Sequence, residues 1–238
     1  MATQFKHNYK EFGAEAITKR VRQMLEFRDQ VDVENAHVKF SYDNRKTGAL
    51  VPSVSLIPVA DCGNCAMCRK GCYDVRNVCF QKTVQKSRAN NSAIYHKDPA
   101  KYFGDIRAAA RFCRFFRWHV GGDIVDFDYL IEMVRIAGEI PTCEFLAFTK
   151  NYEAVNRYLD EGKVFPQNLH IILSGWRMDM PVNKHNLPIS SPVWPDGSQS
   201  CMVTANATWC MGDCSACAEI NGGCWGAKKG DTILFEAH

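Results

Sequence analysis

Residues 115–123 read F-F-R-W-H-V-G-G-D, a dense aromatic run that two glycines and an aspartate end. The run predicts a buried strand, and the glycines mark the turn that follows it. Apolar residues then recur at the helical period over residues 127–137, and Gly138 with Pro141 stops that pattern. The first unit of the fold is therefore a strand followed by a helix.

The same pattern recurs further along the chain. Residues 142–149, T-C-E-F-L-A-F-T, and residues 169–174, L-H-I-I-L-S, read as buried strands. Asn151 caps a helix between them that runs to Leu159 and ends at Gly162. Strands that alternate with helices indicate a parallel sheet with right-handed crossovers. We expect an α/β fold of the β/α-barrel type, complete or partial, with cysteine loops at one end of the barrel; an open sheet is the second architecture.

The flanking sequence supplies further elements. Before the aromatic strand we predict a helix over 13–30, a strand over 39–42, a strand with prolines over 51–59, a partly helical segment over 82–94 and a helix over 98–113 that Asp98 caps. After the third strand, short strands are predicted over 190–194, 202–207 and 232–235. The length of 238 residues fits one α/β domain, 1–238, with a helical N-terminal extension over 1–35.

The strand over 51–59 leads directly into a cysteine loop, residues 60–79. Its first four cysteines, Cys62, Cys65, Cys68 and Cys72, are spaced C-x2-C-x2-C-x3-C, as in the runs with which bacterial ferredoxins hold iron–sulfur clusters. Zinc is the alternative, but three cysteines within seven residues favour a cluster over the separated pairs typical of zinc. Disulfides are not expected, because the N-terminus has no apolar signal segment and a reducing compartment is therefore predicted.

A second cysteine loop is predicted over residues 201–226. It contains the spacing C-x3-C-x2-C-x6-C, formed by Cys210, Cys214, Cys217 and Cys224. These four can hold a second cluster or share ligands with the first loop, and a zinc knuckle is the structural alternative. The expected cofactor is therefore one or two 4Fe–4S clusters. The remaining cysteines are the reserve ligands Cys79 and Cys201, and the predicted core thiols Cys113 and Cys143.

Polar residues end three successive predicted strands. His119 and Asp123 follow the aromatic strand and Lys150 follows the next one, and we predict these three to be catalytic. Gly121, Gly122 and Ser174 are predicted to bind a cofactor or small molecule at the same end of the sheet. The alternative for His119 and Asp123 is a satisfied buried histidine and an aspartate that caps a helix.

Composition narrows the classes of partner. A net charge of +3 and an isoelectric point near 8.2 do not indicate nucleic acid, and the arginines at 107, 111, 114 and 117 are read as a solvated face. No apolar run has the length of a membrane span. We expect a cytoplasmic protein. Its partner would be an electron donor or a small-molecule substrate, and neither that partner nor the oligomeric state follows from the sequence.

Short motifs occur in a fixed order between about residue 50 and residue 226. They are Cys68-x3-Cys72-Tyr73, R-x-H-x-x-G-D over 117–123, F-T-K over 148–150, the strand end at Ser174 and Cys224-Trp225. In this order they resemble the phage-borne gene product 88 domain family. The resemblance implies an iron–sulfur protein of phages and prophages, without a defined activity, located in the host cytoplasm if a phage encodes it. This chain differs from the family pattern by adding Cys65 and by a wider C-terminal group, so the ligand set is not transferred whole.

A looser resemblance is to radical S-adenosylmethionine enzymes, which are β/α barrels with a three-cysteine loop after the first strand and a Gly-Gly-Glu-like segment after the second. Here Gly121-Gly122-Asp123 ends a strand, but the C-x3-C-x2-C spacing falls at Cys210, Cys214 and Cys217 instead of in the first loop. We interpret this as shared architecture more than shared reaction. The leading hypothesis is a cluster-binding protein that is redox-active or an enzyme; the alternatives are a radical S-adenosylmethionine enzyme and a zinc-stabilised nucleic-acid-binding module.

Overall fold

The computed structural model describes residues 14–42, 44, 46–63, 72–176, 181–194, 196–197, 204 and 206–236. Within these ranges the helices are α1 (Ala14–Asp29), α3 (Tyr73–Asn77), α4 (Lys82–Lys97), α5 (Pro99–Ala110), α6 (Phe127–Glu139), α7 (Tyr152–Asp160) and α8 (Cys214–Glu219). The strands are β1 (Phe40–Ser41), β2 (Ser53–Val54), β3 (Phe115–Trp118), β4 (Glu144–Thr149), β5 (Leu169–Ser174), β6 (Ile189–Val193), β7 (Ala207–Trp209) and β8 (Thr232–Glu236). Cys65, Cys68 and Cys201 lie outside the described residues.

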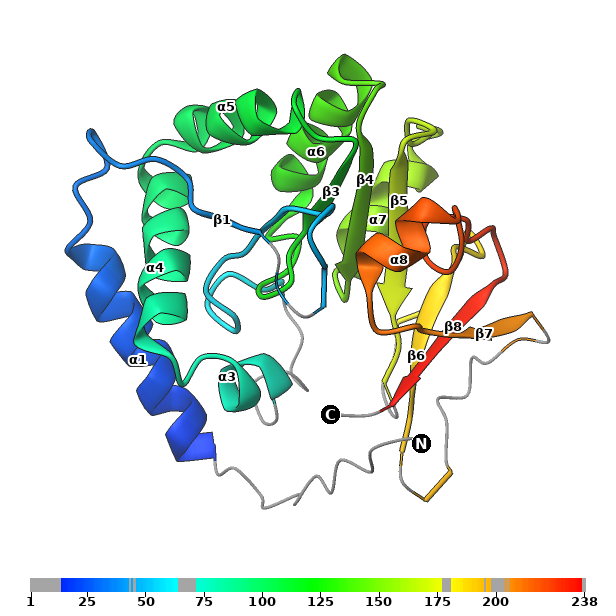
Figure 1. Ribbon diagram of the computed structural model, residues 1–238, viewed down its shortest axis with the longest axis horizontal. Coiled ribbons are helices and arrows are strands. Elements are labelled where there is room, and N and C mark those ends of the chain that lie inside the picture. Colours follow the sequence, from blue (N-terminus) through cyan, green and yellow to red (C-terminus); the bar gives the residue numbers. More distant parts are fainter. Residues whose placement is uncertain are drawn as a thin grey trace.

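The described strands form one eight-stranded sheet in the order β1-β2-β3-β4-β5-β6-β8-β7 (Figure 1). β1 pairs with β2 antiparallel, and each later pair in this order is parallel. β3 to β6 lie side by side in chain order, so successive right-handed crossovers carry α6 and α7 to the same side. We call this side the outer face of the sheet and the opposite side the inner face.

The main core fills the outer face. Alternate residues of the central strands point there, among them Phe116, Trp118 and Phe145, and each is fully buried. Helices α5, α6 and α7 cover these side chains with apolar residues such as Ile106 and Leu130. At about 25 cal/mol per Å² of apolar surface, burial on this scale is the main stabilising contribution to the fold.

A smaller core fills the inner face. The other set of alternate side chains points there, including Phe115, Leu146 and Ile172. They are covered by α8 and by Trp225, whose ring lies 5.1 Å from that of Phe115. The segment with the C-terminal cysteines therefore packs across the sheet, on the side opposite to α6 and α7.

The sheet is open, so the prediction of a complete barrel is wrong and the second architecture, an open sheet, is observed. In the described part of the chain β1 and β7 are the two edges and do not pair with each other. β1 is a two-residue antiparallel strand, and β8 returns between β6 and β7. α8 lies on the inner face, around which a barrel would close, and no described strand joins β7 to β1.

Most predicted elements are confirmed within a few residues. The side chain of Asp98 accepts a hydrogen bond from Lys101 N at the start of α5, and Asn151 accepts one from Ala154 N at the start of α7, as their capping roles predicted. α4 is longer than predicted. It is polar, yet it buries side chains such as Asn91, whose amide bonds to the carbonyl oxygens of Lys39 and Ser55 and so joins α4 to the strands beside it.

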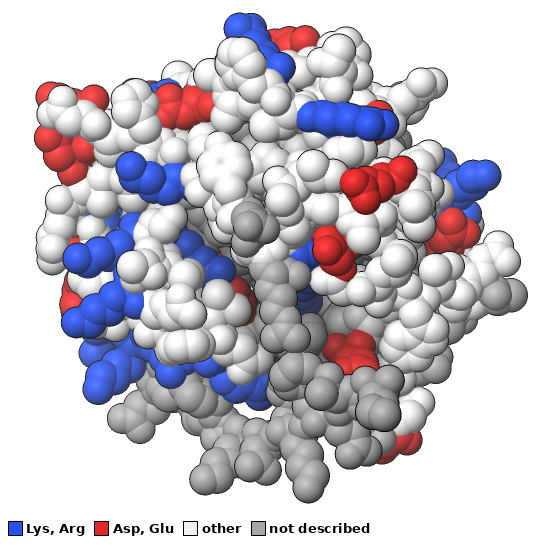
Figure 2. Space-filling model, in the orientation of Figure 1, with Lys and Arg blue, Asp and Glu red and all other residues white. Residues whose placement is uncertain are grey.

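The N-terminal helix packs on the body of the molecule. Met24 of α1 is fully buried in a cluster with Ile57, Cys79 and Ala89, the last from α4. Lys and Arg side chains gather over α1 and α4 on the left of the molecule (Figure 2). In the described residues, no helix is both long enough and apolar enough to cross a membrane.

Candidate functional site

Part of the predicted site assembles at the carboxyl ends of β2, β3 and β4. Cys62 lies there, half-buried, and the loss of water around its thiol raises the pKa of that thiol well above the usual value. The negative charges of Asp123 and Cys72 raise this pKa further, whereas Lys150 lowers it, so all four side chains interact electrostatically. The structure therefore brings Cys62 and Cys72 together with Asp123 and Lys150, two of the three predicted catalytic residues.

Asp123 is held rigidly at this end of the sheet. Its Oδ1 accepts hydrogen bonds from Thr149 Oγ1 (2.6 Å) and from Ile124 N (2.7 Å), and its Oδ2 accepts one from Lys150 N (2.9 Å). Burial raises the pKa of Asp123, while these donors and the charge of Lys150 act in the opposite direction. The carboxylate thus joins the end of β3 to the end of β4.

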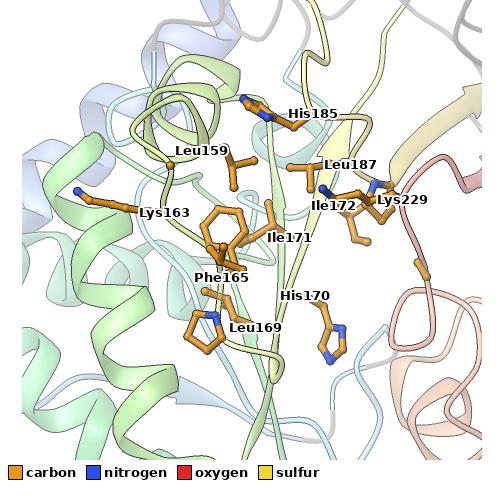
Figure 3. A pocket seen from close by; sticks show the side chains of 15 residues that line it. Leu159, Lys163, Phe165, Leu169, His170, Ile171, Ile172, His185, Leu187 and Lys229 are labelled. Atoms are coloured by element: carbon orange, nitrogen blue, oxygen red, sulfur yellow. The ribbon is translucent and has the colours of Figure 1, made fainter.

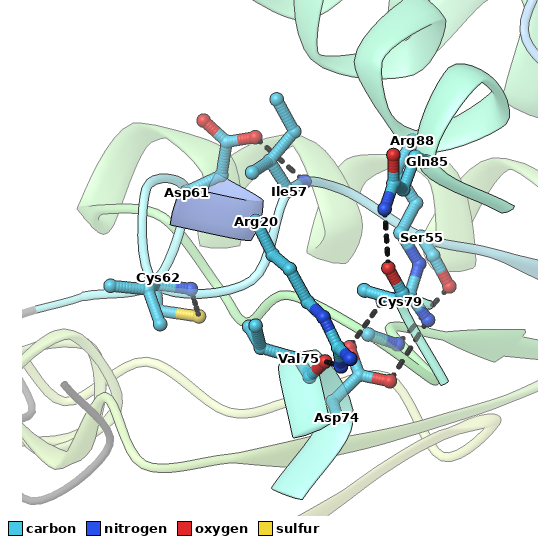
Figure 4. Close-up of polar contacts among 12 residues, drawn as sticks. Arg20, Ser55, Ile57, Asp61, Cys62, Asp74, Val75, Cys79, Gln85 and Arg88 are labelled. Atoms are coloured by element: carbon cyan, nitrogen blue, oxygen red, sulfur yellow. Dashed lines mark hydrogen bonds and ion pairs between the residues drawn. The ribbon is translucent and has the colours of Figure 1, made fainter. Parts of the chain in front are cut away.

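A tight turn precedes Cys62. Asp61 N donates to Ile57 O (2.9 Å), and Asp61 Oδ2 accepts from Ile57 N (2.9 Å), which closes the turn from both directions (Figure 4). Val59, at φ +72°, lies in the left-handed region that β-branched residues rarely adopt. Its N–H donates to Cys62 Sγ over 3.2 Å. The strained turn thus presents a backbone donor to the first cysteine.

His119 lies apart from this network. Its ring packs 5.2 Å from the ring of Tyr129, and no partner for either ring nitrogen is present among the described residues. Burial lowers the pKa of His119 to about 3, although the charge of Asp61 acts to raise it, so the imidazole is neutral near pH 7. His119 also has a φ of +53°. It is therefore a buried histidine, but not the satisfied one of the structural alternative.

The predicted binding glycines contact the protein itself. A Cβ on Gly121 would lie 2.5 Å from Arg88 Cζ, and one on Gly122, at φ +86°, would lie 3.0 Å from Leu56 Cβ. Ser174, at the end of β5, accepts a hydrogen bond from the Tyr152 hydroxyl through its carbonyl oxygen. Close packing therefore explains both glycines, and their predicted role in binding stays a prediction.

A buried ion pair beneath Gly121 was not predicted. Arg88 of α4 pairs with Asp74 through both guanidinium nitrogens, and each side chain is 5% exposed. Arg88 Nη1 also lies 2.7 Å from Cys79 Sγ (Figure 4). The pair connects α3, which follows Cys72, with the turn between His119 and Asp123. The polar residues on the buried face of α4 were the only signal in the sequence.

The C-terminal cysteines form a second group on the inner face. Cys214 is the first residue of α8, and the Asp213 side chain caps that helix by accepting from Ser215 N (2.8 Å) and Ala216 N. Burial raises the pKa of Cys224 to about 12, and the charges of the other three cysteines in the group raise it further. The four thiols Cys210, Cys214, Cys217 and Cys224 thus interact electrostatically with one another, and their predicted role as metal ligands stays a prediction.

Arg117 belongs to this second group. It was predicted to be part of a solvated face, but it is 4% exposed because it lies on the inner face of β3. Its Nη1 lies 3.0 Å from Cys214 Sγ, and its guanidinium lies 4.8 Å from the centre of the Phe148 ring. This correction follows from strand alternation, which the spacing of the arginines did not reveal.

The two cysteine groups share one connection. Lys46 O accepts a hydrogen bond from Cys214 N (3.0 Å), and Lys46 Nζ lies 5.8 Å from the centre of the ring of Tyr73, the residue after Cys72. Among the residues the structure describes, no three His, Cys, Asp or Glu side chains are already arranged around one point as metal ligands. Two of the predicted ligands, Cys65 and Cys68, are not among those residues.

The sulfurs differ in their hydrogen bonding. The sulfurs of Cys62, Cys210 and Cys214 accept hydrogen bonds from the N–H groups of Val59, Gly212 and Arg117. By contrast, Cys113 Sγ lies 3.3 Å from Ala109 O and Cys143 Sγ lies 3.8 Å from Glu144 O, and only a protonated thiol can donate to a carbonyl. The predicted ligands and the predicted core thiols therefore have opposite surroundings.

A pocket of about 490 Å³ lies beside β5 (Figure 3). Ile172, which lines it, also packs in the cluster that contains Cys217 and Cys224. Its walls are mostly apolar, with Leu159, Phe165, Leu169 and Leu187 among them, and it opens beside the amino-terminal half of β5. It is thus at the end of the sheet opposite to Asp123 and Lys150.

Comparison with known proteins supports one assignment. The sequence model of Gene product 88 matches residues 33–188, well over half of the chain. The match includes the first cysteine loop, the strand ends and the buried ion pair, and it stops before the C-terminal cysteine group. No curated protein and no solved structure matches the chain. The chain belongs to the Gene product 88 family.

Proposed function

We propose that this chain is an iron–sulfur protein with its reactive centre at the carboxyl ends of β2, β3 and β4. Cys62, Cys65, Cys68 and Cys72 are the ligands of a 4Fe–4S cluster there, and the C-terminal group supplies thiolates for a second centre. A cluster at this position supplies one-electron transfer, either to an external partner or to a small molecule bound beside it.

Hydrogen bonding to the sulfurs carries this proposal. A thiolate bound to metal can only accept hydrogen bonds, and N–H donors to the sulfurs are among the features that set cluster potentials. Cys62, Cys210 and Cys214 receive such donors, from Val59, Gly212 and Arg117 respectively. The protonated-thiol surroundings of Cys113 provide the internal contrast.

The side chains around the first cysteine loop have defined tasks in this proposal. Lys150 supplies a positive charge near Cys62 and Cys72, which offsets part of the negative charge of bound thiolates. Asp123 fixes the Lys150 backbone through the hydrogen bond to Lys150 N and so positions this residue at the site. The neutral His119 adds no charge near Asp61 and the turn before Cys62.

The test is purification without oxygen followed by iron and sulfide quantitation. We expect a brown protein with broad absorbance near about 400 nm and about four iron and four sulfide for each cluster. Cys62→Ser should lose the iron of the first loop. Cys113→Ser is the matched control, because its thiol is half-buried and donates to a carbonyl, and it should keep all the iron.

Two other results would redirect or end the proposal. A colourless protein that contains only zinc, or no metal after anaerobic reconstitution, would refute it. Release of 5′-deoxyadenosine from S-adenosylmethionine by the reduced protein would assign radical chemistry in place of simple electron transfer.

A further inference from the structure

Arg117 occupies an unusual position for an arginine. It lies in the middle of the sheet, paired in register with Ser53 of β2 and Leu146 of β4, and its side chain is on the apolar inner face. Only 4% of the residue is exposed. A buried cation without a counter-charge destabilises the fold, so the charge of Arg117 requires an anionic partner.

The described residues offer Arg117 no carboxylate. Its Nη1 donates to Cys214 Sγ, and its Nε is buried without any hydrogen-bond partner among these residues. Cys214 belongs to the C-terminal group, and Cys217 and Cys224 of the same group are buried on this face with Phe115 and Trp225. Among the described residues, the sulfurs of this group are therefore the atoms that can supply Arg117 with a negative charge once they bind a metal.

We propose that Cys210, Cys214, Cys217 and Cys224 bind a metal centre of their own and that Arg117 neutralises part of its negative charge. This deepens the proposed function, which assigns a second centre to the C-terminal group, by giving Arg117 a role there. Four thiolates around a dication, or around a 4Fe–4S core of the same charge, carry about two negative charges. On the apolar face between Phe115 and Trp225, such a charge needs a fixed cation.

Guanidinium geometry explains why arginine suits this position. Its planar fork can donate to Cys214 through Nη1 while Nε stays available as a second donor. The Phe148 ring, whose centre lies 4.8 Å from the guanidinium carbon, adds a cation–π contact. Arg117 is a positioning and charge-compensating residue, because it acts on the metal centre through the ligands. Removing it should weaken metal binding and, for an iron centre, make reduction harder, since reduction adds negative charge.

The experiment uses the full-length chain with Cys62 and Cys72 both changed to Ser, so that only the C-terminal centre retains metal. Metal retention against a chelator is compared for Arg117→Gln, Arg117→Lys and the control Arg114→Gln, an exposed arginine three residues earlier. We expect at least a tenfold loss of affinity in Arg117→Gln, substantial recovery in Arg117→Lys and no change in the control. For an iron centre, a tenfold weaker preference for the reduced state lowers the potential by about 59 mV for one electron.

The outcomes separate this inference from the proposed function. Zinc in the C-terminal centre would leave the inference intact and refute an iron–sulfur cluster there. Equal metal retention in Arg117→Gln and Arg114→Gln would overturn the inference even if the first loop contains iron. If Arg117→Gln does not fold, the metal content of a chain with Cys214→Ser and Cys217→Ser is measured instead. A metal content equal to that of the chain without these two changes overturns the inference.

Discussion

His119 gives the fold a defined sensitivity to acid. Burial lowers the pKa of this side chain from 6.5 to about 3 in the folded protein. The unfolded chain therefore binds one proton more than the folded chain between these two values. Stability is complete above the unfolded value and decreases as the pH falls below it, by about 1.4 kcal/mol for each pH unit.

The magnitude follows from linkage. Between pH 8 and pH 5 the single titration should remove about 2 kcal/mol of unfolding free energy, and about 0.8 kcal/mol of this should already be lost at pH 6. The surroundings of His119 account for the size of the effect. Trp118 and Tyr129 exclude water from the ring, and Asp61 is the charged neighbour that acts to raise the pKa.

The assay compares the wild-type chain with His119→Asn by urea unfolding at pH 5, 6, 7 and 8. Asparagine tolerates the φ of +53° and does not titrate. The difference in unfolding free energy between the two proteins therefore reports the imidazole alone, because carboxylates such as Asp123 and the metal ligands are the same in both. We expect this difference to fall by about 2 kcal/mol from pH 8 to pH 5. A difference that stays constant with pH would refute the reasoning, as would a ring that titrates near its ordinary pKa by NMR.

Two further predictions concern the packing beside the cysteine loop. Gly121→Ala places a methyl group 2.5 Å from Arg88 Cζ and should lower the unfolding free energy by about 1–3 kcal/mol. The control Gly104→Ala, in a helix with no atom near its new Cβ, should raise the unfolding free energy by up to about 1 kcal/mol. Similar unfolding free energies for the two variants in urea would contradict the close contact between Gly121 and Arg88. Arg88→Met leaves Asp74 as a lone buried charge and should cost about 3–5 kcal/mol, while Arg135→Met, which breaks an exposed pair, should cost about 1 kcal/mol or less. Thermal unfolding measures both, and an Arg88 variant as stable as the Arg135 variant would show that the buried pair contributes nothing.

Local patterns in the sequence were sufficient for most of the elements. Aromatic and β-branched residues in short runs predicted β3, β4 and β5, and the caps Asp98 and Asn151 predicted where two helices begin. These features depend on neighbours within a few residues, which is why a single sequence reveals them. The polar face of α4 was harder to interpret, because its asparagine and arginine side chains are buried against other segments.

Sequence patterns could not show whether the sheet closes into a barrel. Alternation of strands and helices is the same in a barrel and in an open sheet wound in one direction. The difference lies in where β8 inserts and in what fills the inner face, and both depend on contacts between distant residues. Ile172 packing with Cys217 and Trp225 is one such contact.

The cysteine groups also combine features that spacing predicted with features that only the fold revealed. Spacing alone identified both candidate sets of ligands and placed the first loop beside Asp123 and Lys150. It did not show that His119 packs against Tyr129 of α6, because the positive φ of His119 breaks the alternation expected of a strand. It also did not separate Arg117 from the exposed arginines near it.

By itself the sequence determined the α/β class, the parallel central strands, the caps and the two groups of thiols, because each is written in the spacing of nearby residues. The tertiary structure alone decided that the sheet stays open, that Arg117 lies buried against Cys214, and that Asp74 and Arg88 pair beneath Gly121. These outcomes depend on which residues become neighbours after burial removes them from water, and spacing along the chain does not encode that proximity.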